Sequence, residues 1–121
     1  MKCSGWREAG SSAVYVRDCA SSYRNGTHAA LYSSLFVKNV GAANRGVYLT
    51  AALWDSMLGS NLYGRNSGGY VTIPKGGRVV EFTEGKSVNA ARRGVLNAEA
   101  WVNVKGFPNG FGYVLAAGLA H

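Results

Sequence analysis

Apolar and polar residues alternate along most of this chain with a period of two. The alternation is clear at 14–17, 28–38, 47–54, 71–73, 80–82 and 95–105, and a last apolar run covers 111–115. Successive side chains of a β-strand point to opposite faces of a sheet, so this period is typical of half-buried strands. The best candidate for a helical turn, 89–93, is stopped by Gly94. The pattern predicts seven or eight short strands and no full helix.

Turn-forming residues separate these segments. They occur at 24–26, 41–46, 59–69, 74–77, 84–85 and 106–110. Short strands at regular spacing with turns between them are typical of a two-sheet antiparallel sandwich, and a single closed sheet is the alternative. The chain shows no internal repeat and no linker, so residues 1–121 are expected to form one domain.

The predicted core comes from one face of each segment. In a sandwich, the inner faces of both sheets interdigitate. Many of the inner positions are Ala, which allows close approach of the sheets but buries little area per residue. The inner residues expected on the longest segments are Leu31, Leu35, Val37, Val47, Leu49, Ala51, Leu53, Leu96, Ala98, Ala100, Val102 and Val104.

Three pieces of the chain resemble bacterial extracellular immunoglobulin-like domains. The first, 37–41, contains an Asn39-x-Gly41 turn and is followed by a strand that ends at 53–55. The second, 71–77, contains Pro74-x-Gly76-Gly77 before the strand at 79–82, and the third is the strand 95–105. The resemblance implies an immunoglobulin-like sandwich of secreted type. It rests on turn residues, so it carries an expectation of fold and none of activity.

The two cysteines, Cys3 and Cys19, are expected to form a disulfide across an N-terminal hairpin. A turn at 9–12 would place Cys3 opposite Cys19 and Trp6 opposite Val16. The bond would close a loop of about 17 residues, which stabilises a fold by roughly 3 kcal/mol in the chain-entropy model. Two unpaired core thiols are the alternative. A persistent disulfide implies an oxidising compartment.

This hairpin also resembles the opening of small secreted proteins of actinobacteria. Its two sides, 3–6 and 14–19, are similar in layout to the adaptor subunit of umbrella-toxin particles. The resemblance implies a non-catalytic protein that docks between larger subunits. The chain opens without the apolar segment of a signal peptide, so a secreted protein of this sequence is expected to be a mature form with an added start methionine.

Composition and charge narrow the classes of partner. Of the 121 residues, 47% are hydrophobic and 13 are Lys or Arg against 6 Asp or Glu, so the formal net charge is +7. No apolar run approaches the roughly 20 residues of a membrane span. The basic charges are scattered, which favours a solvated basic surface over a dedicated polyanion site. Four cations lie in predicted loops that could cluster: Lys75, Arg78, Arg92 and Arg93.

Residues suited to catalysis are few. His28 begins a strand after a turn, and the terminal His121 is expected to be disordered or the remnant of a tag. The candidate carboxylates are Glu81, Glu84 and Glu99, and the first and last face away from the predicted core, where they more often pair with Arg or Lys. The glycine-rich stretch 64–69 lacks the ending of a phosphate-binding loop and is expected to be a mobile loop. No metal, nucleotide or organic cofactor is implied, and the chain is not expected to be an enzyme.

Aromatic residues are the stronger functional indication. Tyr32, Phe36, Tyr48, Trp54 and Trp101 all fall on strand faces opposite the predicted core. Exposed aromatics with Arg nearby are enriched in protein interfaces and in platforms that stack sugars or bases. The alternative is that loops cover these rings or that a face is wrongly assigned.

Three functions follow from these features. The first is a secreted, non-enzymatic adaptor that binds a larger protein, with Tyr48, Trp54 and Trp101 at the contact. The second is binding of a carbohydrate or cell-wall polymer, ranked above nucleic acid because a disulfide places the protein outside the cell. The third is a small inhibitor or toxin that presents Arg92 or Arg93 to a protease. The run 111–120 is expected to be the last strand, with exchange into a partner's sheet as the alternative.

Overall fold

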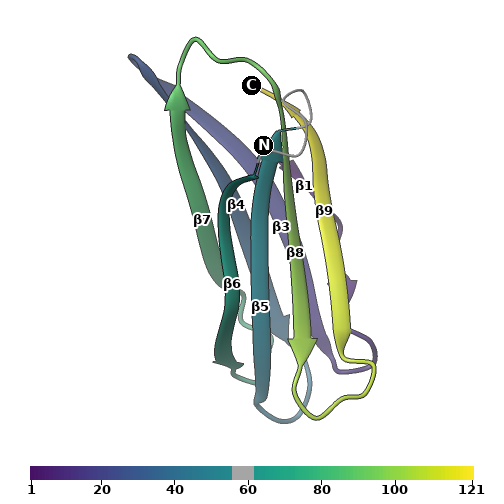
Figure 1. Ribbon diagram of the computed structural model, residues 1–121. Coiled ribbons are helices and arrows are strands. Elements are labelled where there is room, and N and C mark those ends of the chain that lie inside the picture. The colour runs from purple at the N-terminus through teal and green to yellow at the C-terminus, as the bar shows by residue number, and fades with distance from the viewer. Residues whose placement is uncertain (56–61) are drawn as a thin grey trace.

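The chain folds into two antiparallel sheets that pack face to face (Figure 1). A computed structural model describes residues 1–55 and 62–121, and only the backbone of 62–68. In the first sheet, here called the β3 sheet, β1 (Lys2–Cys3) and β2 (Arg7–Glu8) both pair with β3 (Val14–Asn25), followed by β4 (His28–Asn39) and β7 (Val80–Asn89). The second, the β5 sheet, has the order β6 (Leu62–Ile73), β5 (Arg45–Asp55), β8 (Val95–Val104), β9 (Phe111–Ala120). The predicted two-sheet immunoglobulin-like sandwich is confirmed.

Hairpins and crossovers alternate along the chain. Hairpins join β3 to β4, β5 to β6 and β8 to β9, whereas β4–β5, β6–β7 and β7–β8 cross between the sheets. Strands of ten to twelve residues span about 35 Å, which separates the two ends of the sandwich. The lower end in Figure 1 carries the loops at 40–44, 74–79 and 105–110, and the upper end carries the β7–β8 loop and the C-terminus.

The core forms two apolar clusters along the sandwich. The larger one includes Val16, Leu35, Leu49 and Val102, and the smaller one includes Leu31 and other residues nearer the upper end. All of the inner residues expected from the alternation are buried. Packing of these faces removes their apolar area from water and holds the sheets together.

Two polar residues stand between these clusters on the inner face of the β3 sheet. On β3, Asp18 lies between Val16 and Ala20 on the inner face, and on β4 Ser33 faces Ala20, diagonally from Asp18. The Ser33 hydroxyl donates to both carboxylate oxygens of Asp18, at 2.9 and 3.0 Å, and the Cys19 N–H donates to one of them at 3.0 Å. Burial nevertheless raises the pKa of Asp18 to about 7, because these bonds only partly replace water.

Asn39 ties the lower end of the sandwich together. Its buried amide nitrogen donates to the carbonyls of Ala43 and Ile73, at 2.8 and 3.1 Å, and its amide oxygen accepts the Gly41 N–H at 2.9 Å. One side chain therefore orders the β4–β5 loop and joins it to the end of β6. The Asn39-x-Gly41 turn predicted from the sequence is present.

The N-terminal hairpin is closed by the expected disulfide between Cys3 and Cys19, which face each other across β1 and β3. The predicted pairing of Trp6 with Val16 is wrong, because Arg7 faces Val16. Residues 4–6 bulge opposite two residues of β3, so the register shifts by one. Trp6 belongs to this bulge, and the Lys38 ammonium lies 4.3 Å from the centre of its ring.

Two segments expected as turns are strands. Residues 64–69 belong to β6, which pairs with β5 through a bulge, so the predicted mobile loop is wrong. Residues 59–61 of the same predicted turn lie outside the described part of the chain. β7 continues through Gly85, where a Cβ would lie 2.8 Å from the Tyr32 ring on the neighbouring strand. The glycine there allows close approach of an aromatic ring and does not mark a turn.

The helical turn expected at 89–93 is a β-turn. The Arg92 N–H donates to the Asn89 carbonyl at 3.0 Å, and the described part of the chain contains no helix. No helix long and apolar enough to span a bilayer occurs there.

Removing the disulfide is expected to weaken the fold. The variant Cys3→Ser/Cys19→Ser should lose about 3 kcal/mol of unfolding free energy in urea, because the unfolded hairpin regains its loop freedom. Reduction of the wild type should cause a similar loss, and the same reductant should not affect the variant. Equal urea midpoints for the variant and the oxidised wild type would contradict the prediction.

Asp18→Asn is expected to change how stability depends on pH. The folded pKa of Asp18, about 7, lies above the ordinary value of 3.8, so the folded state holds the proton more tightly. The stability associated with this group is fully present below about pH 4, falls as pH rises, and is lost above about pH 7, a change of roughly 4 kcal/mol. In urea unfolding measured from pH 4 to pH 8, the unfolding free energy of the variant should rise relative to that of the wild type by up to about 4 kcal/mol. Parallel stability curves would show that Asp18 titrates normally.

Candidate functional site

The outer face of the β5 sheet gathers aromatic side chains from all four of its strands. Alternation with the core points Tyr48 of β5 and Trp101 of β8 to solvent. The strand register places Tyr70 of β6 opposite Tyr48, and Tyr113 of β9 opposite Trp101. Phe111 extends the set at the start of β9. We call these five residues the aromatic face.

The rings of the aromatic face contact each other in pairs. The Tyr48 and Tyr70 ring centres are 4.8 Å apart, and those of Trp101 and Tyr113 are 5.5 Å apart. Tyr48, Tyr70 and Phe111 remain 46%, 48% and 51% exposed. Because the rings in each pair contact each other and project from hydrogen-bonded strands, the aromatic face is pre-organised for binding.

Polar groups at the border of the aromatic face are already engaged. The Tyr113 hydroxyl donates to the Glu99 carboxylate at 2.6 Å. Burial, this bond and the Glu99 charge raise the pKa of Tyr113 to about 12, so the phenol stays protonated. The Lys105 ammonium lies 5.9 Å from the centre of the Tyr70 ring. Among the side chains that the structure describes, the Lys105 cation lies at the lower border of the aromatic face and the Glu99–Tyr113 pair at its β9 side.

Tyr70 lies across the backbone of the neighbouring strand. A Cβ added to Gly46 on β5 would overlap the Tyr70 hydroxyl and the adjoining ring carbon. Glycine at this position lets the ring lie flat over β5, next to Tyr48.

The aromatics predicted from the sequence divide between the two sheets. Tyr48 and Trp101 lie together, and Trp54 lies on the same outer face but nearer the upper end, opposite Asn97. Tyr32 and Phe36 lie on the outer face of the β3 sheet. There Tyr32 covers Gly85, and the Arg17 guanidinium lies 5.9 Å from the Phe36 ring centre.

The four predicted loop cations do not cluster. Lys75 and Arg78 lie in the β6–β7 loop at the lower end, and Arg92 and Arg93 lie in the β7–β8 loop at the upper end. The length of the strands separates these pairs by about 30 Å. At the upper end, the Arg24 guanidinium donates to the carbonyls of Ala90 and Arg92, which orders that loop.

Three members of the aromatic face were not singled out in the sequence. Phe111 and Tyr113 alternate with buried positions of β9, and Tyr70 precedes Val71, which packs against the core, so extension of the period of two would have placed all three outward. The spacing does not show that β6 and β9 flank β5 and β8, and only this order brings the rings together.

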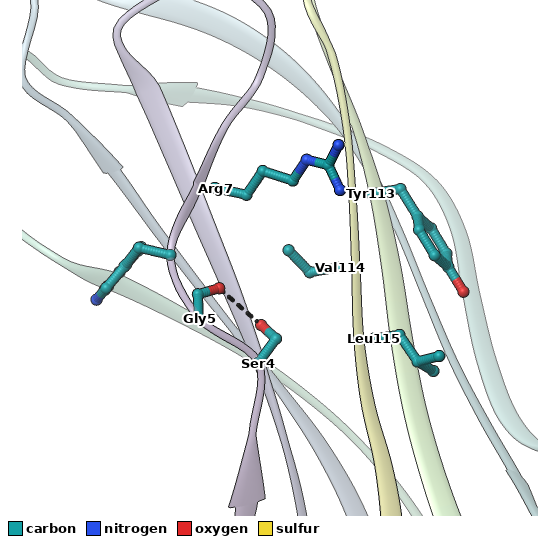
Figure 2. A pocket seen from close by; sticks show the side chains of 7 residues that line it. Ser4, Gly5, Arg7, Tyr113, Val114 and Leu115 are labelled. Carbon is teal, nitrogen blue, oxygen red and sulfur yellow. Dashed lines mark hydrogen bonds between the residues drawn. The ribbon is translucent and has the colours of Figure 1, made fainter.

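A cavity of about 420 Å³ adjoins the aromatic face (Figure 2). One wall is the N-terminal bulge and the start of β2, from Ser4 to Arg7, and the other is the middle of β9, from Tyr113 to Leu115. The Arg7 side chain extends across the opening toward β9 (Figure 2). Tyr113 belongs to both the cavity and the aromatic face.

Titratable groups do not form an active-site constellation in the described residues. His121 is ordered, contrary to expectation: its Nε2 lies 2.6 Å from the buried Asp55 carboxylate, and its backbone exchanges two hydrogen bonds with Gly94. Glu81 and Glu99 lie on outer faces of different sheets, so they cannot act on one substrate bond. Within 1–55 and 62–121, no group of three His, Cys, Asp or Glu side chains could hold a metal ion.

Gly46→Ala is expected to displace the Tyr70 ring while the fold is retained. Nuclear Overhauser contacts between the Tyr48 and Tyr70 rings should weaken, because the new Cβ occupies the space of the Tyr70 hydroxyl. Gly69→Ala on β6 is the matched control, since no atom lies within 4 Å of its added Cβ, and it should leave these contacts intact. Unchanged ring contacts in Gly46→Ala would contradict the placement of Tyr70.

Comparisons with known proteins give information on the fold alone. No protein-family model matches the chain, and no curated protein matches it. Among solved structures, the chain is similar to part of a beta-glucuronidase from glycoside hydrolase family 2, with a TM-score of 0.52 and 10% identity over 81% of this chain. It spans 11% of that enzyme's length. Northeast Structural Genomics Consortium target SoR45 is similar over 90% of this chain and 84% of its own, with a TM-score of 0.51 and 10% identity. At such identities the likeness shows a β-sandwich.

Proposed function

We propose that this chain is a non-catalytic binding module that docks on a larger protein through the aromatic face. One observation carries the proposal: five aromatic side chains from four strands lie on one outer face, four of them in two contacting pairs, and three of the five are about half exposed. An exposed cluster of this kind is rare on a protein that has no partner.

The composition of the face favours a protein partner. Tyr and Trp are enriched among the residues that dominate binding energy, and charged residues are depleted at interface centres. The Tyr48–Tyr70 and Trp101–Tyr113 ring planes are tilted by 58° and 45°, so they present ridges and hollows to a complementary surface. A polysaccharide chain is better matched by rings that share one plane.

Secretion and an adaptor role complete the proposal. The Cys3–Cys19 disulfide supports an extracellular location, because such bonds persist in oxidising compartments. The net charge of +7 supports a partner with an acidic surface, which the chain would attract over long range.

Capture from the culture medium of the producing organism tests the proposal. The oxidised, tagged chain should retain one or two large proteins through a high-salt wash. The variant Tyr48→Ser/Tyr70→Ser should lose them, because it removes two exposed rings from the centre of the contact. Tyr23→Ser is the control, since Tyr23 is 65% exposed on the β3 sheet and should have no effect.

The purified partner then gives an affinity by calorimetry. We expect the double variant to weaken binding at least about tenfold, as for loss of interface aromatics. Equal capture by wild type and double variant would show that the aromatic face is not the contact. Binding of polysaccharides on a glycan array, with no protein retained, would replace the proposal with a carbohydrate-binding module.

A further inference from the structure

β9 is an edge strand that carries no charged residue, and the N-terminal segment with β1 and β2 covers only part of its free edge. It is the last strand of the β5 sheet, and none of its described residues has a backbone hydrogen bond to β1 or β2. Its ten residues include no charge and no proline. By contrast, the edge strand β7 carries Glu81, Glu84 and Lys86. Natural proteins use charges, prolines or covering segments to keep edges from pairing with other chains.

The surroundings of β9 leave its central part accessible. Near the lower end, Gly112 packs against Ala9, so that part of the edge is covered. Beside Tyr113, Val114 and Leu115 the covering segment bulges away and leaves the cavity of about 420 Å³ (Figure 2). Leu115 is 40% exposed there. If an extended peptide paired with this part of β9, the cavity would lie on the side of the peptide that faces away from β9.

Two cations lie along this edge. The Arg7 side chain extends across the cavity toward β9 (Figure 2), and the Lys2 ammonium lies 4.0 Å from where a Cβ of Gly118 would stand. Neither side chain has an acidic partner among the described residues. The neighbouring acids are engaged elsewhere: Glu8 accepts the Ala13 N–H, and Glu99 accepts the Tyr113 hydroxyl.

We propose that the edge of β9 accepts an extended, acidic segment of the partner protein as an added strand. This rests on the proposed function, because it names the chemistry of the partner. Main-chain hydrogen bonds to β9 would supply affinity, and alternate side chains would meet the cavity or continue the aromatic face. Acidic residues of the added strand would meet Arg7 and Lys2, which lie beside positions about 17 Å apart along β9.

Charge favours this occupant over a second copy of the chain. Pairing of two β9 edges would bring together two chains of formal charge +7, with their Arg7 and Lys2 side chains along the shared edge. Like charges so placed oppose association, whereas an acidic strand is attracted.

A peptide selection on the oxidised chain tests the inference. A phage-displayed library of random dodecapeptides is panned on the immobilised protein, with lysozyme as a basic control surface. We expect enriched peptides with two or more acidic residues and alternating apolar positions. With the synthetic peptide bound, alternate β9 amides from Tyr113 to Ala117 should exchange more slowly in hydrogen-exchange spectra of the ¹⁵N-labelled chain.

Charge reversal separates a specific edge contact from general attraction. Lys2→Glu/Arg7→Glu should weaken binding of the selected peptide at least about tenfold, since two attractive pairs become repulsive. Lys75→Glu/Lys86→Glu changes the net charge equally at exposed positions away from β9, so it should alter affinity less than about threefold at 0.15 M salt.

The other outcomes overturn the inference in distinguishable ways. Peptides that perturb Tyr48 and Tyr70 but leave the β9 amides unprotected would overturn it and leave the proposed function standing. Absence of enrichment over lysozyme would overturn it as well. A dimer in sedimentation, with β9 protected in the absence of peptide, would make a second copy the occupant. Failure of the proposed function would be seen in a different experiment: the Tyr48→Ser/Tyr70→Ser variant would capture as much partner protein as the wild type.

Discussion

The packing of two apolar inner faces against each other is the constraint on which the rest of this structure depends. Each long strand commits alternate residues to that contact, from Val14 and Val16 on β3 to Val102 and Val104 on β8. Where the inner position is polar, the structure satisfies it locally: Ser33 and the Cys19 N–H bind Asp18, and three backbone groups bind Asn39. The cost of burying Asp18 remains visible in its raised pKa.

Because the inner faces are committed to the core, binding chemistry is left to the outer faces and the edges. The two outer faces differ. On the β3 sheet, Trp6 and Phe36 each lie close to a cation, whereas on the β5 sheet the rings contact one another in pairs and Tyr70 also lies near Lys105. The disulfide holds the N-terminal hairpin beside β9, and the bulge at 4–6 opens the cavity there. The aromatic face, the cavity and the partly covered edge of β9 are therefore continuous, and Tyr113 belongs to both the aromatic face and the cavity.

Much of the fold could be predicted from the period of two, and the errors have physical causes. The sequence predicts turns at the glycines of 64–69 and at Gly85, although a glycine in a strand can equally mark a bulge or an aromatic ring that crosses the backbone. The one-residue shift at 4–6 could not be predicted, because the bulge depends on hydrogen bonds between Ser4 and Asp18. His121 was expected to be disordered, and its partner Asp55 lies 66 residues away.

The sequence by itself determined the class of fold, the buried face of each strand and the disulfide, because these follow from alternation and short-range pairing. It also placed Tyr48 and Trp101 outward. Only the tertiary structure decided the strand order β6-β5-β8-β9, which joins Tyr70 and Tyr113 to those residues and leaves β9 at the edge. It also separated the predicted loop cations and placed Lys2 and Arg7 along β9 instead. Strand order depends on contacts between residues far apart in the chain, which local spacing does not encode.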